Sequence, residues 1–527
     1  MGIYLNPGND SFERALNSRI YVDKSELIAC TNDVLGSEQC NLCVSRPRRF
    51  GKSMAANMLA AYYSRGCESG ELFQSLKVSK NPSYQMHLNQ HDVIYMNVQQ
   101  FLRSAKEPEN LVNCMEQKVV DEIREIYGSC FGQEVRSLPD ALTAVFSKAI
   151  QPTKGFIFII DEWDCVFREA RDHVEAQKAY LNFLRDLLKD RSYVQLAYMT
   201  GILPIKKYGT HSALNIFQEY SMTNADVLAE YMGFTESEVK NLCERFEKPF
   251  DEVQKWYDGY QLADDLHIYN PKSVIDGMLS RRLKSFWTGT ETYEALQIYI
   301  DLDYDGLKSE IISMLGGGIC KTDVGSFQND MTTFKSRDDV FTLLVHLGYL
   351  GYHEMEQTVF IPNEEVRLEF IRALKNGKRP ELVKAILTSD QLLEATLTMD
   401  EKKVAALIDE VHSATTTPLM YNDEESLRSV IKLAYYSSKD DYYAIQELPS
   451  GVGYADIVFL PRRGSEKPAL VVELKWDKKA QGAIAQIKKQ KYVQAIENYG
   501  GPVILAGICY DKNTKKHECV IETYQKE

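Results

Sequence analysis

Gly51, Lys52 and Ser53 are adjacent residues of the types that bind phosphate and magnesium. They follow an apolar run at residues 42–44 and precede a helical pattern at residues 54–63. A strand, a turn and a helix with Gly-Lys-Ser at the turn are typical of a phosphate-binding loop. Backbone N–H groups at the helix start would face the β- and γ-phosphates, Lys52 would supply a cation, and the Ser53 hydroxyl would ligate Mg²⁺. The stretch therefore predicts a site for ATP with Mg²⁺.

One position departs from the usual pattern of such a loop. The pattern opens with glycine five residues before the Gly-Lys pair, where this chain has Arg46. A basic turn that binds nothing is therefore the alternative interpretation. We call residues 46–53 the phosphate loop. The residues expected to contact the nucleotide are Arg49, Phe50, Gly51, Lys52, Ser53, Met54, Asp161 and Thr200.

Two carboxylates, Asp161 and Glu162, follow an unbroken apolar run at residues 156–160. Five apolar residues without alternation indicate a strand buried on both faces of a parallel sheet. Asp161 would hold Mg²⁺ through its water shell together with Ser53, and Glu162 would act as the catalytic residue that polarises the attacking water. Taken alone, an Asp-Glu pair is equally typical of a helix N-cap and first turn.

A second buried run, residues 194–201, ends in a polar residue. Thr200 would lie at the tip of this strand, beside the γ-phosphate. Lys206 and Lys207 follow it and could act on a phosphate of their own subunit or of a neighbour. A solvated loop is the alternative for both lysines, and we favour it.

The C-terminal part carries a separate set of charged residues. Side chains at i and i+2 of a strand share a face, so Glu473 and Lys475 would point together while Val472 and Leu474 point into the core. A neighbouring strand carries Asp456. The two carboxylates would form an oxygen-rich site for Mg²⁺ or Mn²⁺, and Lys475 would orient a water or stabilise developing charge. A Glu-Lys pair on an edge strand is the alternative.

The residues around this set favour the metal site. An acidic helix start at residues 423–425 precedes it, and the helix predicted at residues 480–498 carries Gln486. Five lysines lie on or just before that helix, and a phosphate backbone is a plausible partner for such a basic face. They are Lys478, Lys479, Lys488, Lys489 and Lys491.

The elements that must position these residues alternate between strand and helix in the N-terminal part, which predicts a doubly wound parallel α/β sheet. A helical region follows, interrupted by aromatic turns at residues 256–260 and 269–271. A helix at 340–347 and a hairpin after it suggest a winged-helix-like module that could contact DNA or join domains, and we favour the joining role. In the C-terminal sheet, residues 503–508 are expected to form the closing strand. The expected domains are residues 1–222, a lid at 223–300, a connector at 301–379 and a C-terminal domain at 380–527.

Composition limits the classes of protein. The chain has 527 residues, 44% hydrophobic and 26% charged, with a net charge of −14 that argues against non-specific coating of nucleic acid. Eleven cysteines, an odd number, are typical of reduced thiols in the cytoplasm. We find neither a secretory signal nor a membrane span, and expect a cytoplasmic protein.

Both sets of motifs resemble known families. The first resembles the bacterial AAA-ATPase-like family, in which Arg-Pro-Arg-Arg-x-Gly-Lys-Ser is the usual loop, so Arg46 fits; the motifs are residues 21–24, 45–53, 160–162, 200–202 and 256–260. The second resembles the PD-(D/E)XK nuclease superfamily, with a restriction-endonuclease-like fold; the motifs are residues 421–424, 453–456 and 473–475. The superfamily's Pro-Asp is Ala455-Asp456 here, which leaves the metal ligand intact.

The resemblance implies a P-loop ATPase joined to a metal-dependent nuclease. It assigns Asp456, Glu473 and Lys475 to the nuclease centre, with Asp456 and Glu473 as metal ligands and Glu424 and Gln486 as further catalytic residues. We expect ATP to gate cleavage of DNA, with defence against foreign DNA as one setting for such an enzyme, and assembly of a homo-oligomer through the ATPase domain. The alternative is a nucleotide-dependent sensor or scaffold whose C-terminal domain binds nucleic acid or a partner without cutting.

Overall fold

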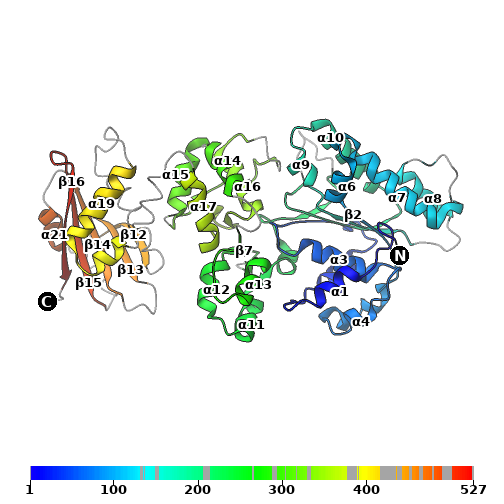
Figure 1. Cartoon of the computed structure of the whole chain (residues 1–527), viewed down its shortest axis with the longest axis horizontal. Helices are drawn as coiled ribbons and strands as arrows, with labels where there is room; N and C mark the ends of the chain where they lie inside the picture. Colours follow the sequence, from blue (N-terminus) through cyan, green and yellow to red (C-terminus); the bar gives the residue numbers. More distant parts are fainter. Residues whose placement is uncertain are drawn as a thin grey trace. The chain divides into compact units, whose positions relative to one another are not determined.

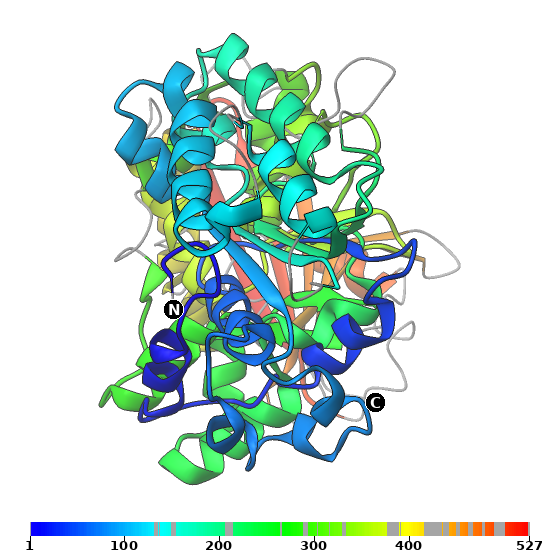
Figure 2. The same cartoon turned by 90° about the vertical axis from the view of Figure 1, so that its right-hand side faces the viewer.

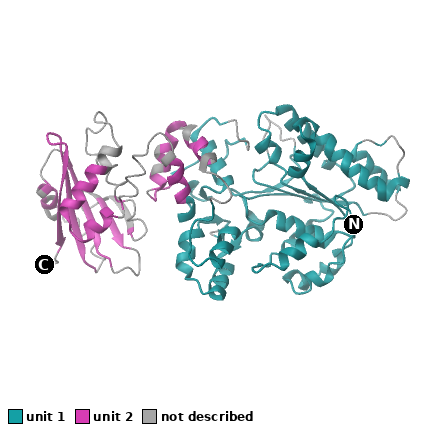
Figure 3. Cartoon of the chain, in the orientation of Figure 1, with its two compact units in different colours: residues 1–290, 320–366 teal, residues 291–319, 367–527 magenta. Residues whose placement is uncertain are grey.

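The computed structural model of the chain forms two compact units (Figure 3). The first comprises residues 1–290 and 320–366, and the second comprises residues 291–319 and 367–527. The structure describes residues 2–130, 135, 137–148, 154–205, 214–263, 266–287, 293–302, 304–315, 317–328, 334–376, 389, 391–415, 435, 442–449, 454–461, 467–476, 480–489 and 501–524.

A five-stranded sheet, ordered β2-β3-β4-β1-β5 and parallel throughout, organises the first unit (Figure 1). The strands are β1 (Asn41–Ser45), β2 (Asp92–Asn97), β3 (Phe156–Asp161), β4 (Val194–Gly201) and β5 (Gln218–Tyr220). The predicted parallel sheet is confirmed, and its order sets β4 between β1 and β3. Because all five strands run in one direction, their carboxyl ends meet at one edge of the sheet.

Helices cover both faces of this sheet, the blue ones on one side and the cyan ones on the other (Figures 1 and 2). Alternate residues of β3 join opposite cores: Ile157 and Ile159 pack with α3 (Lys52–Tyr63), whereas Phe156, Phe158 and Ile160 pack with α7 (Leu111–Tyr127). All five are fully buried, which explains the unbroken apolar run. The other helices are α1 (Asp10–Leu16), α2 (Leu27–Val34), α4 (Gly70–Phe73), α5 (Tyr84–His87), α6 (Val98–Ala105), α8 (Leu138–Lys148), α9 (Cys165–Glu169) and α10 (Val174–Leu188).

The region after this sheet is mainly helical, with α11 (Glu236–Phe246), α12 (Phe250–Tyr257) and α13 (Pro271–Leu279). The first aromatic turn leads from the end of α12 to a strand that begins at Tyr260, and the second leads from a strand that ends at Tyr269 into α13. These strands were not predicted from the sequence. The strands β6 (Phe234–Thr235), β7 (Tyr260–Leu262) and β8 (Leu266–Tyr269) form an antiparallel sheet in the order β6-β8-β7, which we call the small sheet.

The helix and hairpin expected further on are present as α16 (Arg337–Leu347), β10 (Gly351–His353) and β11 (Thr358–Phe360). Strand β9 (Cys320–Lys321) completes an antiparallel sheet beside β11. Residues 339–347 of α16 are all buried, so this helix is not exposed for insertion into a DNA groove. Helices α14 (Tyr293–Leu302) and α15 (Leu307–Leu315) belong to the second unit, and α17 (Glu364–Asn376) spans the boundary.

The second unit contains a mixed five-stranded sheet ordered β12-β13-β14-β15-β16. Its strands are β12 (Tyr442–Pro449), β13 (Tyr454–Pro461), β14 (Ala469–Trp476), β15 (Val503–Asp511) and β16 (Lys516–Tyr524). The prediction that residues 503–508 close the sheet is wrong, because β16 pairs antiparallel with β15 along nine residue pairs and is the edge strand. Helices α19 (Glu401–Thr415) and α21 (Ala480–Lys489) pack against this sheet. No helix in the described parts of the chain is both long and apolar enough to cross a membrane.

Candidate nucleotide site and candidate nuclease centre

The phosphate loop leads from the end of β1 into α3, as the sequence predicts. Its backbone turns through the left-handed region at Arg49 (φ 69°) and Gly51 (φ 91°). Glycine suits the second position, and a Cβ built there would meet no atom within 4 Å, so the space above the loop is open. Helix α3 begins at Lys52, and the N–H groups of its first turn have no intrahelical acceptor. The loop therefore offers several N–H donors and the positive end of a helix to an anion.

Lys52 is a buried cation, with 4% of its surface exposed. Its Nζ donates to the Pro47 carbonyl oxygen at 2.9 Å, so the side chain folds back over its own loop. Burial lowers the pKa of Lys52, while the nearby carboxylates of Glu162, Asp164 and Asp161 act in the opposite direction. A phosphate at the loop would supply a close anionic hydrogen-bond partner in place of the neutral Pro47 carbonyl.

Polar side chains end three adjacent strands of the sheet. Asn97 of β2 is paired with Asp161 of β3, and Asp161 is paired with Thr200 of β4. The Asn97 Nδ2 donates to Asp161 Oδ2 at 3.2 Å, so Asn97 is a site residue that the sequence analysis missed. The sequence offered one signal for Asn97: it ends an apolar strand, β2, which precedes β3 along the chain. The buried Thr200 Oγ1 has no hydrogen-bond partner among the described residues, which leaves it available to a ligand.

Ser53 and Asp161 lie together. Burial raises the pKa of Asp161, and a hydrogen bond with the Ser53 side chain opposes that rise. A second bond reaches Asp161 Oδ1 from the Glu162 N–H at 3.0 Å. The hydroxyl and the carboxylate are oxygen donors of the kind that Mg²⁺ prefers, and they lie beside the loop that would hold the phosphates. The residues present therefore fit a magnesium ion bound with a nucleotide.

Glu162 has a left-handed backbone (φ 55°), so the chain turns sharply directly after β3. Its carboxylate forms an ion pair with Arg168. The Arg168 Nε also donates to Asp164 Oδ2 at 2.9 Å, and the same oxygen accepts from the Leu203 N–H at 2.9 Å. Burial lowers the pKa of Arg168, but Asp164 and Glu162 outweigh it, so the net pKa is raised. Sequence reasoning missed both Asp164 and Arg168, which no motif distinguishes.

Arg46, which replaces the expected glycine, has a defined place in the fold. Its side chain is fully buried, and Nη1 donates to the carbonyl oxygens of Ser45 at 2.8 Å and Tyr220 at 2.9 Å. Burial lowers the pKa of Arg46 to about 10. The guanidinium thus links the end of β1 to the end of β5 at the start of the phosphate loop.

Residues distant in sequence hold the loop from the other side. The Phe50 ring packs edge-on against Tyr260 at 5.4 Å between ring centroids, and the Phe50 carbonyl accepts from the Gly233 N–H at 3.0 Å. Tyr260 in turn donates to the Gly348 carbonyl at 2.6 Å. Phe50 is 1% exposed, so its side chain anchors the loop and is not presented to a ligand. Its backbone remains available for the predicted nucleotide contact, and Met54 and Ser53 are exposed on the first turn of α3.

In the second unit, Glu473 and Lys475 share one face of β14 as their spacing predicts. The Lys475 Nζ donates to Glu473 Oε1 at 2.9 Å, and both side chains are buried. Val472 and Leu474 are buried on the opposite face, but Val471, on the Glu473 face, is also in a core with Ile484 of α21. The pair therefore lies in a sheet covered on both faces and not on an exposed edge.

Strand β13 is the antiparallel neighbour of β14, as expected for the strand that carries Asp456. The register pairs Ile457 with Val472, so Asp456 and Glu473 are the next residues along the two strands. Residues opposite each other in such a pair project from the same face. The structure describes the backbones of Asp456 and Gln486 but not their side chains. Glu424, Lys206 and Lys207 lie outside the described residues.

Comparisons with known proteins agree with this arrangement. Residues 8–211 match the family model described as "Predicted AAA-ATPase", and residues 422–519 match the model of the "PD-(D/E)XK nuclease superfamily". The order of the two domains predicted from the motifs is thereby confirmed. A protein of Azotobacter chroococcum mcd 1, described as "Uncharacterized protein in vnfD 5'region", is 26% identical over 265 residues. That match covers 47% of this chain and 48% of the relative, so the chain spans about half the relative's length.

Proposed function

We propose that the chain binds and hydrolyses ATP at the phosphate loop, and that its nucleotide state gates a Mg²⁺-dependent nuclease in the second unit that cleaves DNA. The observation that carries the ATPase part is the row of Asn97, Asp161 and Thr200 at one sheet edge, with the buried cation of Lys52 beside it. The Glu473–Lys475 pair next to the Asp456 strand carries the nuclease part.

In this proposal the backbone N–H groups from Arg49 to Met54 bind the phosphates, and Phe50 fixes the loop from below. Lys52 exchanges its bond to the Pro47 carbonyl for one to a phosphate oxygen. Ser53 and Asp161 would hold Mg²⁺, which supplies charge neutralisation on the phosphates when bound. Thr200, whose buried hydroxyl has no partner among the described residues, would bond the terminal phosphate or the attacking water.

Hydrolysis needs a group that orients water, and Glu162 is the candidate. Its carboxylate forms an ion pair with Arg168. Binding of a nucleotide brings a new anion close to Lys52 and Arg168, and we propose that Arg168 then shifts toward phosphate and leaves Glu162 able to accept a proton from water.

At the nuclease centre the carboxylates of Asp456 and Glu473 would hold Mg²⁺, with Mn²⁺ as an alternative ion, and this metal supplies an activated water and neutralises phosphate charge when bound. Lys475 would donate to a phosphate oxygen or position that water, and we place Glu424 and Gln486 as supporting catalytic residues. The lysines near α21 would contact the DNA backbone. We propose a cytoplasmic protein, a homo-oligomer formed through the ATPase part, and defence against foreign DNA as its setting.

Cleavage assays test the nuclease directly. The full chain is incubated with plasmid, linear and single-stranded DNA and with RNA, with Mg²⁺ or Mn²⁺, and with or without ATP. We expect metal-dependent DNA cleavage that falls by about 10²–10³-fold in Lys475→Ala, and no loss in the control Lys516→Ala, which alters an exposed lysine of β16. If the wild type cuts nothing while still binding DNA, the sensor or scaffold is the better description.

Gating has a separate readout. Lys52→Ala should abolish ATP binding and remove the effect of ATP on cleavage, while the exposed control Lys80→Ala keeps both. Unchanged ATP binding in Lys52→Ala would show that the nucleotide site is assigned wrongly. If the wild type cleaves DNA equally well with and without ATP, ATP does not control the nuclease and the two activities are independent.

A further inference from the structure

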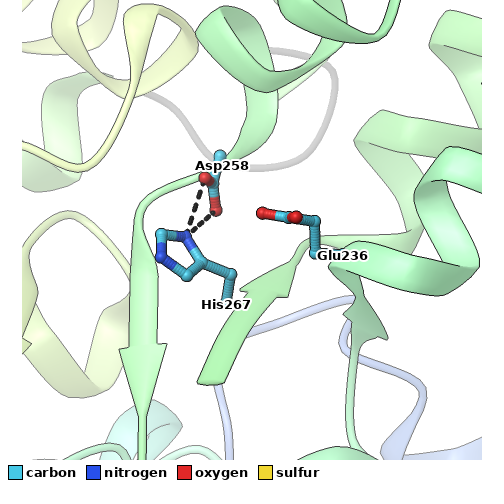
Figure 4. A group of neighbouring side chains, drawn as sticks. All are labelled: Glu236, Asp258 and His267. Carbon is cyan, nitrogen blue, oxygen red and sulfur yellow. Dashed lines mark hydrogen bonds and ion pairs between the residues drawn. The ribbon is translucent and has the colours of Figure 1, made fainter. Parts of the chain in front are cut away.

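Three potential metal ligands converge at the small sheet of the first unit (Figure 4). Glu236 is the first residue of α11, Asp258 directly follows α12, and His267 lies on β8. One ligand atom from each lies within 4.8 Å of the other two. Asp258 belongs to the aromatic turn at residues 256–260, a motif to which the proposed nucleotide and nuclease chemistry gives no role.

The separations suit a small divalent ion. The His267 Nδ1 faces the Asp258 carboxylate, with distances of 2.9 Å to Oδ2 and 3.1 Å to Oδ1. In the tetrahedral geometry usual for Zn²⁺, two ligands with bonds of about 2.1 Å lie about 3.4 Å apart, which falls between the 2.9 Å of the His267–Asp258 contact and the 4.8 Å limit of the cluster. Glu236 points toward the pair, and a small rotation of its partly exposed side chain would bring its oxygen into range.

The other ring nitrogen of His267 is also held. Its Nε2 lies 3.3 Å from the amide nitrogen Nε2 of Gln261, and the Gln261 Oε1 is buried with no hydrogen-bond partner among the described residues, so exchanging the amide oxygen and nitrogen satisfies both groups. In the amide orientation that presents Oε1, Gln261 accepts from Nε2–H, and Nδ1 then carries a lone pair. A metal-binding histidine usually has its second nitrogen fixed by such a bond. In that tautomer, the Nδ1 lone pair and the Asp258 carboxylate face each other and need a cation between them.

A buried hydroxyl beside the cluster is an independent observation. Tyr269 is fully buried, and its hydroxyl interacts with the Asp258 carboxylate but makes no hydrogen bond of full geometry among the described residues. Burial raises the pKa of Tyr269, and Asp258 and Glu236 raise it further, which places the hydroxyl next to both carboxylates. A water bound to an ion in the cluster would give this hydroxyl a partner.

We propose that Glu236, Asp258 and His267 bind one first-row divalent transition-metal ion, with Zn²⁺ as the probe. One imidazole and two carboxylates are ligands that such ions accept, and a water would complete the shell. The site is structural: the Asp258 carbonyl accepts from Asn363 Nδ2 at 2.7 Å, and two residues later Tyr260 packs against Phe50 of the phosphate loop. An ion here would brace the segment that holds the loop.

The competing interpretation is a plain ion pair. A protonated His267 would neutralise Asp258. Lys240, four residues further along α11, already forms an ion pair with the Glu236 carboxylate. This alternative needs no metal, and it predicts that added Zn²⁺ changes nothing at these residues.

The test is Zn²⁺ binding to nucleotide-free full-length protein after chelator treatment, followed by calorimetry and by metal analysis. We expect the wild type to bind one equivalent more than Glu236→Gln or His267→Gln, or to bind it at least about 10-fold more tightly, and to unfold at a higher temperature when loaded. The control Glu252→Gln, an exposed acid on α12, should match the wild type. Any contribution from the nuclease centre is common to all four proteins.

Equal Zn²⁺ stoichiometry and affinity in all four proteins would overturn the proposal, and so would a wild type that binds no ion beyond the control level. Circular dichroism checks folding of each variant. Because the Glu236 side chain is 33% exposed, Glu236→Gln keeps the test decisive even if His267→Gln misfolds.

Discussion

Arg168 forms an ion pair with Glu162, six residues before it in the chain. The same guanidinium holds Asp164, whose carboxylate fixes the Leu203 N–H after β4. Arg168 therefore connects Glu162, which directly follows the proposed Mg²⁺ ligand Asp161, to the segment after β4, the strand that carries Thr200. The position of Glu162 depends on this pair, which makes its removal informative.

Replacing Glu162 with glutamine keeps the shape of the side chain and removes its basicity. We expect Glu162→Gln to bind ATP about as well as the wild type and to hydrolyse it about 10²–10⁴-fold more slowly. Fluorescent-nucleotide binding and phosphate release measure the two quantities. Glu175→Gln, which alters an exposed acid of α10, is the control. Undiminished hydrolysis in Glu162→Gln would assign the role to another group.

Phe50→Ala should weaken both the fold and nucleotide binding. The ring is buried against Tyr260, and its loss leaves a cavity that costs about 3–5 kcal/mol of unfolding free energy. The freed loop would then lose about 10-fold in ATP affinity, because binding must order it. Urea denaturation and nucleotide titration check both effects, and Phe50→Leu should fall between. An unchanged affinity in a destabilised Phe50→Ala would mean that the loop is preorganised without this contact.

The stability of the first unit should fall in mild acid because of His91. Burial lowers its pKa to about 4, and His87, Lys154 and Arg65 add to that shift. Between about pH 6.5 and pH 4, the histidine is protonated in the unfolded chain but not in the folded chain. The free energy of unfolding therefore falls as the pH drops from about 6.5 to about 4. The loss reaches about 3 kcal/mol, and His91→Gln should show a flatter pH profile in urea denaturation than the wild type or His353→Gln.

Variants of the Glu473–Lys475 pair should distinguish its effect on the stability of the fold from its role in DNA cleavage. Glu473→Gln leaves Lys475 buried without its charge partner, which costs about 3–5 kcal/mol of unfolding free energy. Glu473→Gln combined with Lys475→Met removes both charges and should recover much of that loss. Cleavage should be absent in the single and the double variant alike. A double variant that still cuts DNA would exclude the pair from the reaction.

The sequence predicted the placement of the candidate residues best where that placement depends on local geometry. The strand before Asp161 and the i, i+2 pair of Glu473 and Lys475 follow from burial and from strand periodicity, and the structure has both. The edge strand β16 was missed although His517, Cys519 and Ile521 alternate with more exposed residues in the usual manner. His517 is a polar residue on the buried face, which obscures that alternation in the sequence.

Residues that act through tertiary contacts could not be predicted. Arg168 and Asp164 have no motif, and only the fold brings them to Glu162. Asn97 becomes meaningful once β2 is known to be the neighbour of β3. Likewise, nothing around Phe50 in the sequence points to Tyr260, because the contact depends on a small sheet whose short strands were not predicted.

The contacts that fix the phosphate loop come from residues synthesised much later than the loop itself, which has a consequence for folding during translation. Asn270, whose side chain contacts the Arg48 carbonyl, is 222 residues further along the chain, and Gly348 comes later still. At translation rates of about 5–20 residues per second, the ribosome needs about 10–45 seconds to add the first of these contacts. We therefore expect stalled nascent chains to bind a fluorescent ATP analogue only once the small sheet has emerged, so that an unfinished chain neither captures nor consumes nucleotide.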